Sequence, residues 1–473
     1  MRRLIRTSFI AVLCLLGATA QAATRQITGQ TPSGAWYRID VPDGWKAGDA
    51  VVFYQHGFEF STPSGPPSLG PLKDIALAEG YAIAEGYAIA ASSFRQRGWA
   101  LFTALDDNRE LLDVFTQSFG APGEMVPFGG SMGGLVALKL AEAEGFPPVR
   151  GALAMCPAAA GARLWDSGID LRLAYAVVCK DAGDLTRGEE PLWWAFNLDM
   201  IPDNLGDLSD LPGLVDNADV LNALAQVNRC TGVNLPTYLR NDAMKRRLAE
   251  LMAFTHITDE KFFLTNVGYS TFVLADLVRA PDKLAGLNPF TTAGVDYGSD
   301  PAIAAGIDRF AADPVAAHAL HASSDFNGRI GSAKILSMHT SRDQLVIPGN
   351  EDFIRAVVPA DQLTTAIVDE DAPTHCGFNE AEGLAGWEAL RAWKDGAPQP
   401  SVANLQTACQ AVVAQGIADG PCRFDPDAQI VPFADIVRPR PPLMQRPSGH
   451  SSHAHPAPRM RPDAAVIGAR RAE

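Results

Sequence analysis

The chain has 473 residues, 47% hydrophobic and 20% charged, with a formal net charge of −15. This composition is typical of a globular protein with one large domain or two medium ones, and it excludes a chain that is disordered or membrane-embedded as a whole. The acidic balance is unfavourable for contact with phosphate backbones or anionic lipid, so neither nucleic acid nor a membrane surface is an expected partner.

The N-terminus has the features of a secretory signal. Three arginines lie within the first six residues, Phe9–Leu16 is a short apolar run, and Ala20-Gln21-Ala22 fits a cleavage site. The apolar run is shorter than the ~20 residues that a membrane span needs. Cleavage after residue 22 would change the net charge from −15 to −15 − 3 = −18. We therefore expect a secreted or periplasmic protein. An uncleaved anchor is the alternative.

Seven cysteines become six once Cys14 leaves with the signal. An even number of cysteines in an exported chain indicates disulfides. Cys409 and Cys422 are close in sequence, and Cys179 and Cys230 lie in the same long insert, so each of these is an expected pair. Cys156 and Cys376 then remain as the third pair. The expected pairs are Cys409–Cys422, Cys179–Cys230 and Cys156–Cys376. No Cys/His spacing of a zinc site is present, so we expect neither a metal nor another cofactor.

Strand-like and helix-like segments alternate in the first part of the chain, which indicates a parallel sheet covered on both faces. A tandem hexamer, EGYAIA, occupies residues 79–84 and 85–90, and the second copy is the expected strand. The other expected strands are Trp36–Val41, Ala50–Gln55, Met125–Phe128 and Val149–Met155, and the expected helices are Leu105–Phe119 and Leu135–Glu144.

The pattern becomes mainly helical over residues 158–329, and the alternation then returns. The returning elements are strands Ile335–His339 and Thr364–Val368 and helices Glu351–Val358 and Glu380–Trp393. We predict an α/β core in two parts with a large helical cap inserted after the sixth strand. The predicted segments are core 23–157, cap 158–329, core 330–396, a C-terminal appendage 397–437 and a disordered tail 438–473.

Gly129-x-Ser131-x-Gly133 is a candidate nucleophile elbow. A serine on a sharp strand-to-helix turn needs small neighbours so that the backbones can approach one another. The motif lies between a predicted strand and a predicted helix, which is the context that this geometry requires. A glycine-rich turn with an idle serine is the alternative.

A serine nucleophile needs a base and a group that orients the base. His375 follows the last predicted strand, and Asp343 follows the strand before it, which gives the chain order Ser, Asp, His. Asp369 and Asp371 are the alternative acids. The competing histidines are His256, His318, His321 and His339, and we expect His339 to pack or to form local hydrogen bonds.

Two further loops follow strands that end at the same edge of the sheet. The backbone N–H groups of Met132 and Phe58 are the expected oxyanion donors, with His56 supporting the second of these loops. Arg95 and Trp99 follow the next strand and are possible substrate contacts, because ligands in such sheets bind beyond the carboxyl ends of the strands.

Four motifs in this order resemble the α/β-hydrolase superfamily over about residues 50–394, apart from the cap. They are Gln55-His56-Gly57-Phe58, Gly129–Gly134, His339–Asp343 with Pro348, and Thr374–Phe378. The resemblance implies a serine hydrolase that forms an acyl-enzyme. The His375-Cys376 pair also resembles the tannase and feruloyl esterase group, in which a cysteine beside the serine bonds one beside the histidine. Here Gly130 precedes Ser131, so the chain departs from that pattern, and Cys156 is the candidate partner of Cys376.

Three functions are compatible with these motifs. The first is hydrolysis of a small-molecule carboxylic ester with a small or medium acyl group, with the cap shaping the pocket. The second is peptide or amide hydrolysis by the same residues, and the third is ligand binding on an inactive hydrolase scaffold. The sequence does not decide the oligomeric state, the acyl group or the alcohol.

Overall fold

The computed structural model describes residues 24–69, 86–183, 185, 218–298 and 300–440. The predicted signal, the first EGYAIA copy and the chain beyond residue 440 lie outside this part.

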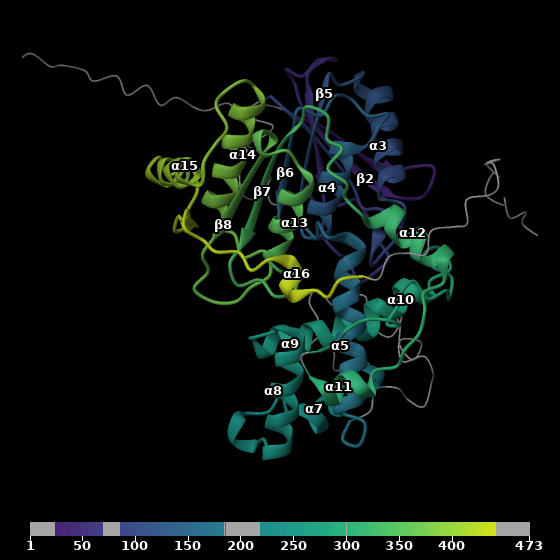
Figure 1. Ribbon diagram of the computed structural model, residues 1–473. Coiled ribbons are helices and arrows are strands. Elements are labelled where there is room, and N and C mark those ends of the chain that lie inside the picture. The colour runs from purple at the N-terminus through teal and green to yellow at the C-terminus, as the bar shows by residue number, and fades with distance from the viewer. Residues whose placement is uncertain (1–23, 70–85, 184, 186–217, 299, 441–473) are drawn as a thin grey trace, which may run out of the picture.

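One sheet of nine strands forms the centre of the molecule, in the order β1-β2-β4-β3-β5-β6-β7-β8-β9 (Figure 1). Neighbouring strands from β4 to β8 run parallel, while β1, β2 and β9 pair antiparallel with their neighbours. The strands are β1 (Thr24–Gln30), β2 (Trp36–Pro42), β3 (Ala50–Gln55), β4 (Ala88–Ser92), β5 (Glu124–Gly130), β6 (Gly151–Met155), β7 (Lys334–Thr340), β8 (Leu363–Val368) and β9 (Phe424–Asp425).

Alternate residues of the central strands pack into two different cores, as expected for a sheet covered on both faces. In β3, Val51 and Phe53 pack with helices α3, α4 and α13, whereas Val52 packs with α14 and α15. These helices are α3 (Ala104–Phe119), α4 (Met132–Glu142), α13 (Gly349–Val357), α14 (Glu380–Lys394) and α15 (Val402–Ala414). The predicted mostly parallel, two-sided sheet is therefore present, and β1 and β9 are strands that the sequence pattern did not predict.

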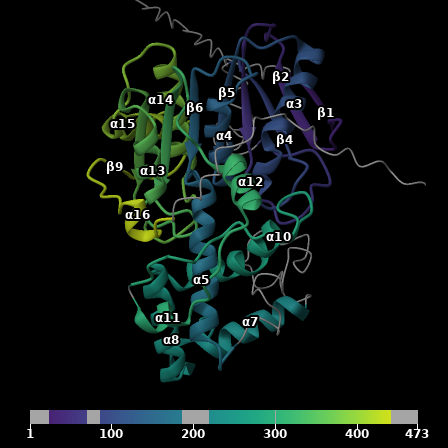
Figure 2. The same cartoon turned by 45° about the vertical axis from the view of Figure 1, so that its right-hand side comes forward.

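A group of helices lies between β6 and β7 in the chain, and most of them extend from one end of the core (Figures 1 and 2). The last of them, Pro314–Ser324, lies beside the core and contacts residues 100–102. The long helix α5 leaves the core and contacts α8, α9 and α11. The helices are α5 (Leu164–Val178), α7 (Ala218–Thr231), α8 (Asp242–Thr255), α9 (Glu260–Gly268), a π-helical turn (Tyr269–Val273), α10 (Leu274–Arg279), α11 (Pro301–Gly306) and α12 (Pro314–Ser324). We refer to this group as the cap. In the described part of the chain, no helix combines the length and apolarity that a bilayer span requires.

The segment predicted as a C-terminal appendage is built into the molecule. Helix α15 packs beside α14, and β9 extends the sheet by pairing with β8. The chain then continues through α16 (Phe433–Ile436), which lies between the core and the cap (Figure 1). We call residues 428–440 the strap. The sequence places the start of the tail at residue 438, but Arg438 and Arg440 are held by ion pairs with Asp170 and Asp166 of α5, so the ordered chain extends further than predicted.

All three expected disulfides are present. Cys179–Cys230 joins the end of α5 to α7, and Cys409–Cys422 joins α15 to the segment before β9. Cys156–Cys376 links two parts of the core that are 220 residues apart in sequence, with a Cα–Cα distance of 5.5 Å. Three disulfides are typical of a protein that folds in an oxidising compartment.

Candidate active site

Ser131 lies in the sharp turn between β5 and α4. Its φ of 58° and ψ of −126° form a left-handed conformation that non-glycine residues rarely adopt. The turn depends on glycine, because a Cβ atom on Gly133 would overlap the carbonyl oxygen of Gln55 and one on Gly129 would overlap the carbonyl of Gly133. This arrangement is the geometry of a nucleophile elbow, which places a serine at the carboxyl edge of the sheet beside a helix N-terminus.

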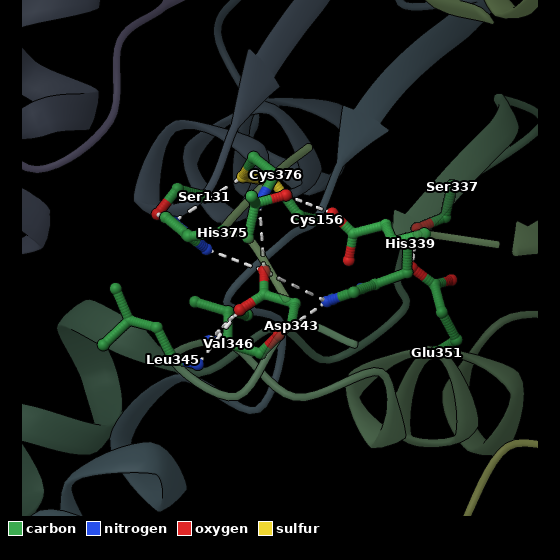
Figure 3. Close-up of a disulfide and its surroundings, with 12 residues drawn as sticks. Ser131, Cys156, Ser337, His339, Asp343, Leu345, Val346, Glu351, His375 and Cys376 are labelled. Carbon is green, nitrogen blue, oxygen red and sulfur yellow. Dashed lines mark hydrogen bonds and ion pairs between the residues drawn. A yellow bond between two sulfur atoms is a disulfide. The ribbon is translucent and has the colours of Figure 1, made fainter. Parts of the chain in front are cut away.

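Ser131, His375 and Asp343 form one hydrogen-bonded chain (Figure 3). The Nε2 atom of His375 lies 2.9 Å from Ser131 Oγ, and its Nδ1 atom lies 2.7 Å from Asp343 Oδ2. Because a carboxylate only accepts, Nδ1 carries the proton that it donates to Asp343 and Nε2 is free to accept from the serine. The three predicted side chains are thus brought together from loops that follow β5, β7 and β8.

Asp343 is held by four donors. Its Oδ1 accepts from the N–H groups of Leu345 (3.0 Å) and Val346 (3.1 Å), and its Oδ2 accepts from His375 and from the N–H of Cys376 at 3.2 Å. Burial alone would raise the pKa of Asp343, but its interactions with His375, the charge of His339 and the N–H of Leu345 together hold the pKa below its ordinary value. This carboxylate is therefore ionised and fixed in orientation. Asp369 and Asp371, the alternative acids, do not occupy this position.

The Cys156–Cys376 disulfide fixes the loop that carries His375. Cys156 directly follows β6, and Cys376 directly follows the histidine. Both cysteines have left-handed φ values, 41° and 54°. Cys156, Asp343, His375 and Cys376 are close enough together to suggest a metal site, but their two sulfurs are bonded to each other and are not free to bind a cation.

The loop after β3 lies directly beside the elbow. A Cβ atom on Gly57 would lie 3.6 Å from the Cβ of Ser131, so the chain at residues 56–58 passes close to the serine. His56 supports this loop by donating from Nδ1 to the carbonyl oxygen of Gly57 at 2.8 Å. Burial lowers the pKa of His56, which keeps the ring neutral. The ring of Phe58 packs on Tyr269 of the cap, with a centroid distance of 5.3 Å.

Ser131 opens into a cavity of about 440 Å³ between the core and the cap. Most of the wall is apolar or aromatic, and the cap contributes Trp165 and Leu171 from α5. The carboxylates in the wall are Asp343, which is saturated by donors, and Asp425 of β9. The apolar side chains of the wall include Phe58, Trp99, Met132, Leu164, Trp165, Leu171, Ile257, Leu345, Val346, Ile347, Val431, Ile436 and Val437.

The two possible substrate contacts have different positions. Trp99 lines the cavity, donates from Nε1 to Ser324 Oγ at 2.8 Å, and packs edge-on against Trp165. Arg95 does not line this cavity in the described part of the chain. Its Nε lies 3.0 Å from an oxygen of the buried Asp107, and it faces a separate polar cavity. The ion pair with this buried carboxylate places the Arg95 guanidinium at the separate cavity, so the contact of Arg95 with substrate stays a prediction that its position in the structure does not favour.

The sequence did not identify the strap as part of the cavity. Val431, Ile436 and Val437 of the strap line the cavity. The mainly apolar run from Ile430 to Val437 is the sequence feature that indicates a segment packed against the rest of the protein. The strap is anchored to α5 by Arg438, whose Nε lies 2.5 Å from Asp170, and by Arg440, whose Nε lies 2.6 Å from Asp166.

No protein-family model matches the chain, and no curated protein is significantly similar to it. Solved structures with a related chain path include feruloyl esterase B from Aspergillus oryzae, at 15% identity and a TM-score of 0.37, covering 80% of this chain and 82% of that one. A mutant of the rice cell wall degrading esterase LipA from Xanthomonas oryzae aligns at 12% identity and a TM-score of 0.39, covering 80% and 94%. Candida antarctica lipase A, in its closed state, aligns at 12% identity and a TM-score of 0.39, covering 80% and 79%.

The fold class follows from the topology of the chain. A mostly parallel sheet has helices on both faces, an elbow serine follows β5, and an aspartate and a histidine follow two later strands in that order. These are the defining features of the α/β-hydrolase fold. The chain has this fold, with its helical cap inserted between β6 and β7.

Proposed function

We propose that the protein is a serine hydrolase that cleaves carboxylic esters through an acyl-enzyme. The observation that supports this function best is the hydrogen-bonded chain from Asp343 through His375 to Ser131, which opens into an apolar cavity. Ser131 is the nucleophile, His375 the general base, and Asp343 the group that fixes the tautomer of the histidine and stabilises its protonated form.

In the first half of the reaction, Ser131 Oγ attacks the ester carbonyl carbon while its proton passes to Nε2 of His375. The carbonyl oxygen becomes an oxyanion beside the N–H groups of Met132 and Phe58, at the helix N-terminus and in the adjacent loop. The intermediate collapses, the alkoxide takes the proton from His375, and the alcohol leaves. Water then repeats these steps on the acyl-enzyme and releases the acid.

The wall of the cavity supports an uncharged and mainly apolar acyl group of small or medium size. Its volume of about 440 Å³ is within the usual range for small-molecule sites. A carboxylate-bearing acyl group would have to be desolvated against Trp165, Leu171 and the strap, which is costly. Arg342, a cation that lines the cavity, already donates from Nη1 to the carbonyl oxygen of Asp371 at 2.8 Å. A peptidase that selects a free N-terminus needs a carboxylate that can bind an ammonium group. Both oxygens of Asp343 already accept hydrogen bonds, and Asp425, the other carboxylate of the described wall, accepts from the N–H of Asp427 through Oδ1.

The test compares p-nitrophenyl esters from acetate to decanoate with amino-acid p-nitroanilides. We expect ester turnover in the wild type, with kcat lower by about 10⁶ in Ser131→Ala. Ser323→Ala, a serine of α12 outside the cavity, is the matched control and should keep wild-type rates. Faster anilide than ester cleavage would favour a peptidase. Absence of both activities, together with no labelling of Ser131 by a fluorophosphonate probe, would reject the hydrolase and leave a binding protein.

We also propose that the protein is exported, with residues 1–22 removed. The three disulfides and the signal-like N-terminus support this location. N-terminal sequencing of protein recovered from periplasm or culture medium should begin at Ala23, and recovery of the intact N-terminus in a membrane fraction would contradict export as a soluble protein.

A further inference from the structure

A second imidazole lies behind the carboxylate of the candidate active site (Figure 3). His339, on β7, is fully buried, with 0% of its surface exposed. Its Nε2 atom lies 2.6 Å from the carbonyl oxygen of Val346 and 4.0 Å from Asp343 Oδ2. Its Nδ1 atom lies 3.2 Å from Oε1 of Glu351, a fully buried residue on α13. The imidazole thus has an acidic side chain on each side.

The partners of the ring limit its protonation state. A carbonyl oxygen only accepts, so Nε2 of His339 carries a proton. Oε1 of Glu351 also accepts from Ser337 Oγ at 2.8 Å. A second proton lies between Nδ1 and Oε1 of Glu351. If Nδ1 carries it, the pair is an imidazolium with a carboxylate, and if Glu351 carries it, both groups are neutral.

Charge balance favours the imidazolium. If both groups were neutral, the buried carboxylate of Asp343 would face the ring without a positive charge behind it, whereas the imidazolium places one with its Nε2 atom 4.0 Å from Asp343 Oδ2. Burial alone would lower the pKa of His339, but the hydrogen bond and charge of Glu351, together with the charge of Asp343, raise it above its ordinary value. With His339 charged, the set of Asp343, Glu351 and His339 carries one net negative charge. Protonation of His375 during the reaction then neutralises it.

The same contacts fix the loop that presents Asp343. His339 donates to the carbonyl of Val346, and the N–H of Val346 donates to Asp343 Oδ1. The ring thus binds the backbone of Val346, and that backbone binds the carboxylate, so His339 helps to hold Asp343 in place. A change at His339 would act on Ser131 only through Asp343 and His375.

We propose that His339, held as an imidazolium by Glu351, is a positioning residue for Asp343. Its positive charge keeps Asp343 ionised and partly offsets the negative charge of Asp343 at His375, so that His375 stays unprotonated at lower pH. This inference rests on the proposed hydrolase function. It assigns a role to a buried ion pair that does not touch the substrate cavity.

The charged groups around this pair come from four elements. Glu351 lies on α13, Asp343 and Arg342 on the loop after β7, and His375 on the loop before α14. Asp369 and Glu370 follow β8, where they accept hydrogen bonds from Ser341 Oγ and from the N–H of Arg342. The flanking strands β6 and β8 contain no ionisable residue. Glu351 lies nearer to the His339 ring than Asp343 does, at 3.2 Å against 4.0 Å, so Glu351 is the group to change.

Glu351→Gln tests the proposal with little change of shape. Glutamine removes the negative charge that holds the imidazolium, and its amide N–H can donate to Nδ1 of a neutral His339 while Nε2–H still reaches Val346. We expect the acid limb of the kcat/KM profile to move to higher pH by about half a unit to one unit. The plateau should fall by only about two- to fivefold, with KM for a p-nitrophenyl ester unchanged, because the substrate wall is untouched.

Ser337→Ala is the matched control, because it removes a hydrogen bond to Glu351 but leaves both charges. Its acid limb should coincide with that of the wild type. A lowered plateau with an unmoved acid limb in Glu351→Gln, or an equal movement in Ser337→Ala, would overturn the proposal, because the pair would then be structural only.

A measurement on the wild-type protein covers the case in which Glu351→Gln fails to fold. In ¹⁵N-histidine NMR at pH 7, the fully buried ring should show both nitrogens protonated, whereas a free imidazole is mostly neutral at that pH. A neutral His339 at pH 7 would overturn the proposal. Fluorophosphonate labelling of Ser131 is scored separately, so loss of the proposed function is distinguishable from a neutral His339.

Discussion

Removal of the disulfide between Cys156 and Cys376 should lower both stability and turnover. The bond closes a loop with a sequence separation of 220. In the chain-entropy description, closing a loop of that size stabilises the folded state by about 5 kcal/mol at 25 °C. The Cys179–Cys230 bond of the cap spans 51 residues and corresponds to about 4 kcal/mol. Removal of either bond should therefore lower the free energy of unfolding by a similar amount, but only Cys156–Cys376 lies directly beside His375.

The effect on turnover follows from the position of Cys376. Its peptide N–H donates to Asp343 Oδ2, and it directly follows His375 in the chain. Without the sulfur bond to Cys156, the His375 loop loses its covalent link to the end of β6. A displacement of the base by about 1 Å can lower the rate about 100-fold, so we expect kcat of Cys156→Ala/Cys376→Ala to fall by about 10- to 100-fold.

The assay measures urea unfolding by tryptophan fluorescence and ester turnover on protein titrated with a fluorophosphonate. Cys179→Ala/Cys230→Ala should lose comparable stability but keep kcat within about twofold, because the cap bond does not hold the base. Wild-type kcat in the Cys156/Cys376 variant, with the loop verified as unbonded, would refute the idea that this disulfide positions His375. Equal loss of kcat in both variants would refute it as well.

Three further outcomes are expected. Gly133→Ala should give a protein that is unfolded in a thermal melt or inactive in the ester assay, because the added Cβ would overlap the carbonyl oxygen of Gln55. Gly44→Ala, with open space around the added Cβ, should melt like the wild type. Val431→Asp should raise KM for p-nitrophenyl octanoate by about 10-fold, because it places a charge in the apolar wall of the cavity, and leave acetate turnover unchanged. The thermal melt should not change, because this side chain is 56% exposed. An equal change in KM for both esters would contradict an apolar wall at the strap. Burial raises the pKa of Asp170 to about 6, so the unfolded state ionises first as pH rises from about 4 to 6. Over that interval the wild type should lose about 2 kcal/mol of unfolding free energy relative to Asp170→Asn. Parallel stability curves of the two proteins in urea would contradict this.

The parts of the site that could be predicted from the sequence are those with a local chemical requirement. The elbow around Ser131 needs glycines at two fixed positions, and that requirement is visible in the sequence as a motif between a strand and a helix. Asp343 and His375 follow from the order in which strands reach one edge of the sheet. The pair Cys156 and Cys376 remains once Cys409 and Cys422 are joined by their closeness in sequence and Cys179 and Cys230 by their place in one insert.

The parts that could not be predicted depend on long-range packing. Strand β9 has only two residues, so it has no periodicity to detect, and its pairing with β8 turns an apparent appendage into part of the sheet. Arg95 was expected at the substrate because of its place after a strand, but a buried Asp107 decides its position. The sequence predicted local contacts for His339, yet its pairing with Glu351 places a charge behind Asp343 that a strand pattern does not reveal.

The strap has a consequence for when the protein can become active during its synthesis. Residues 428–440 complete the wall of the cavity and bind α5 of the cap through Asp166 and Asp170, yet the ribosome adds them after every other described part of the site. A nascent chain that already contains Ser131, Asp343 and His375 would still present an open, apolar cavity. We therefore expect nascent chains to require protection from aggregation until the strap has emerged, and a mature pocket to form only after that point.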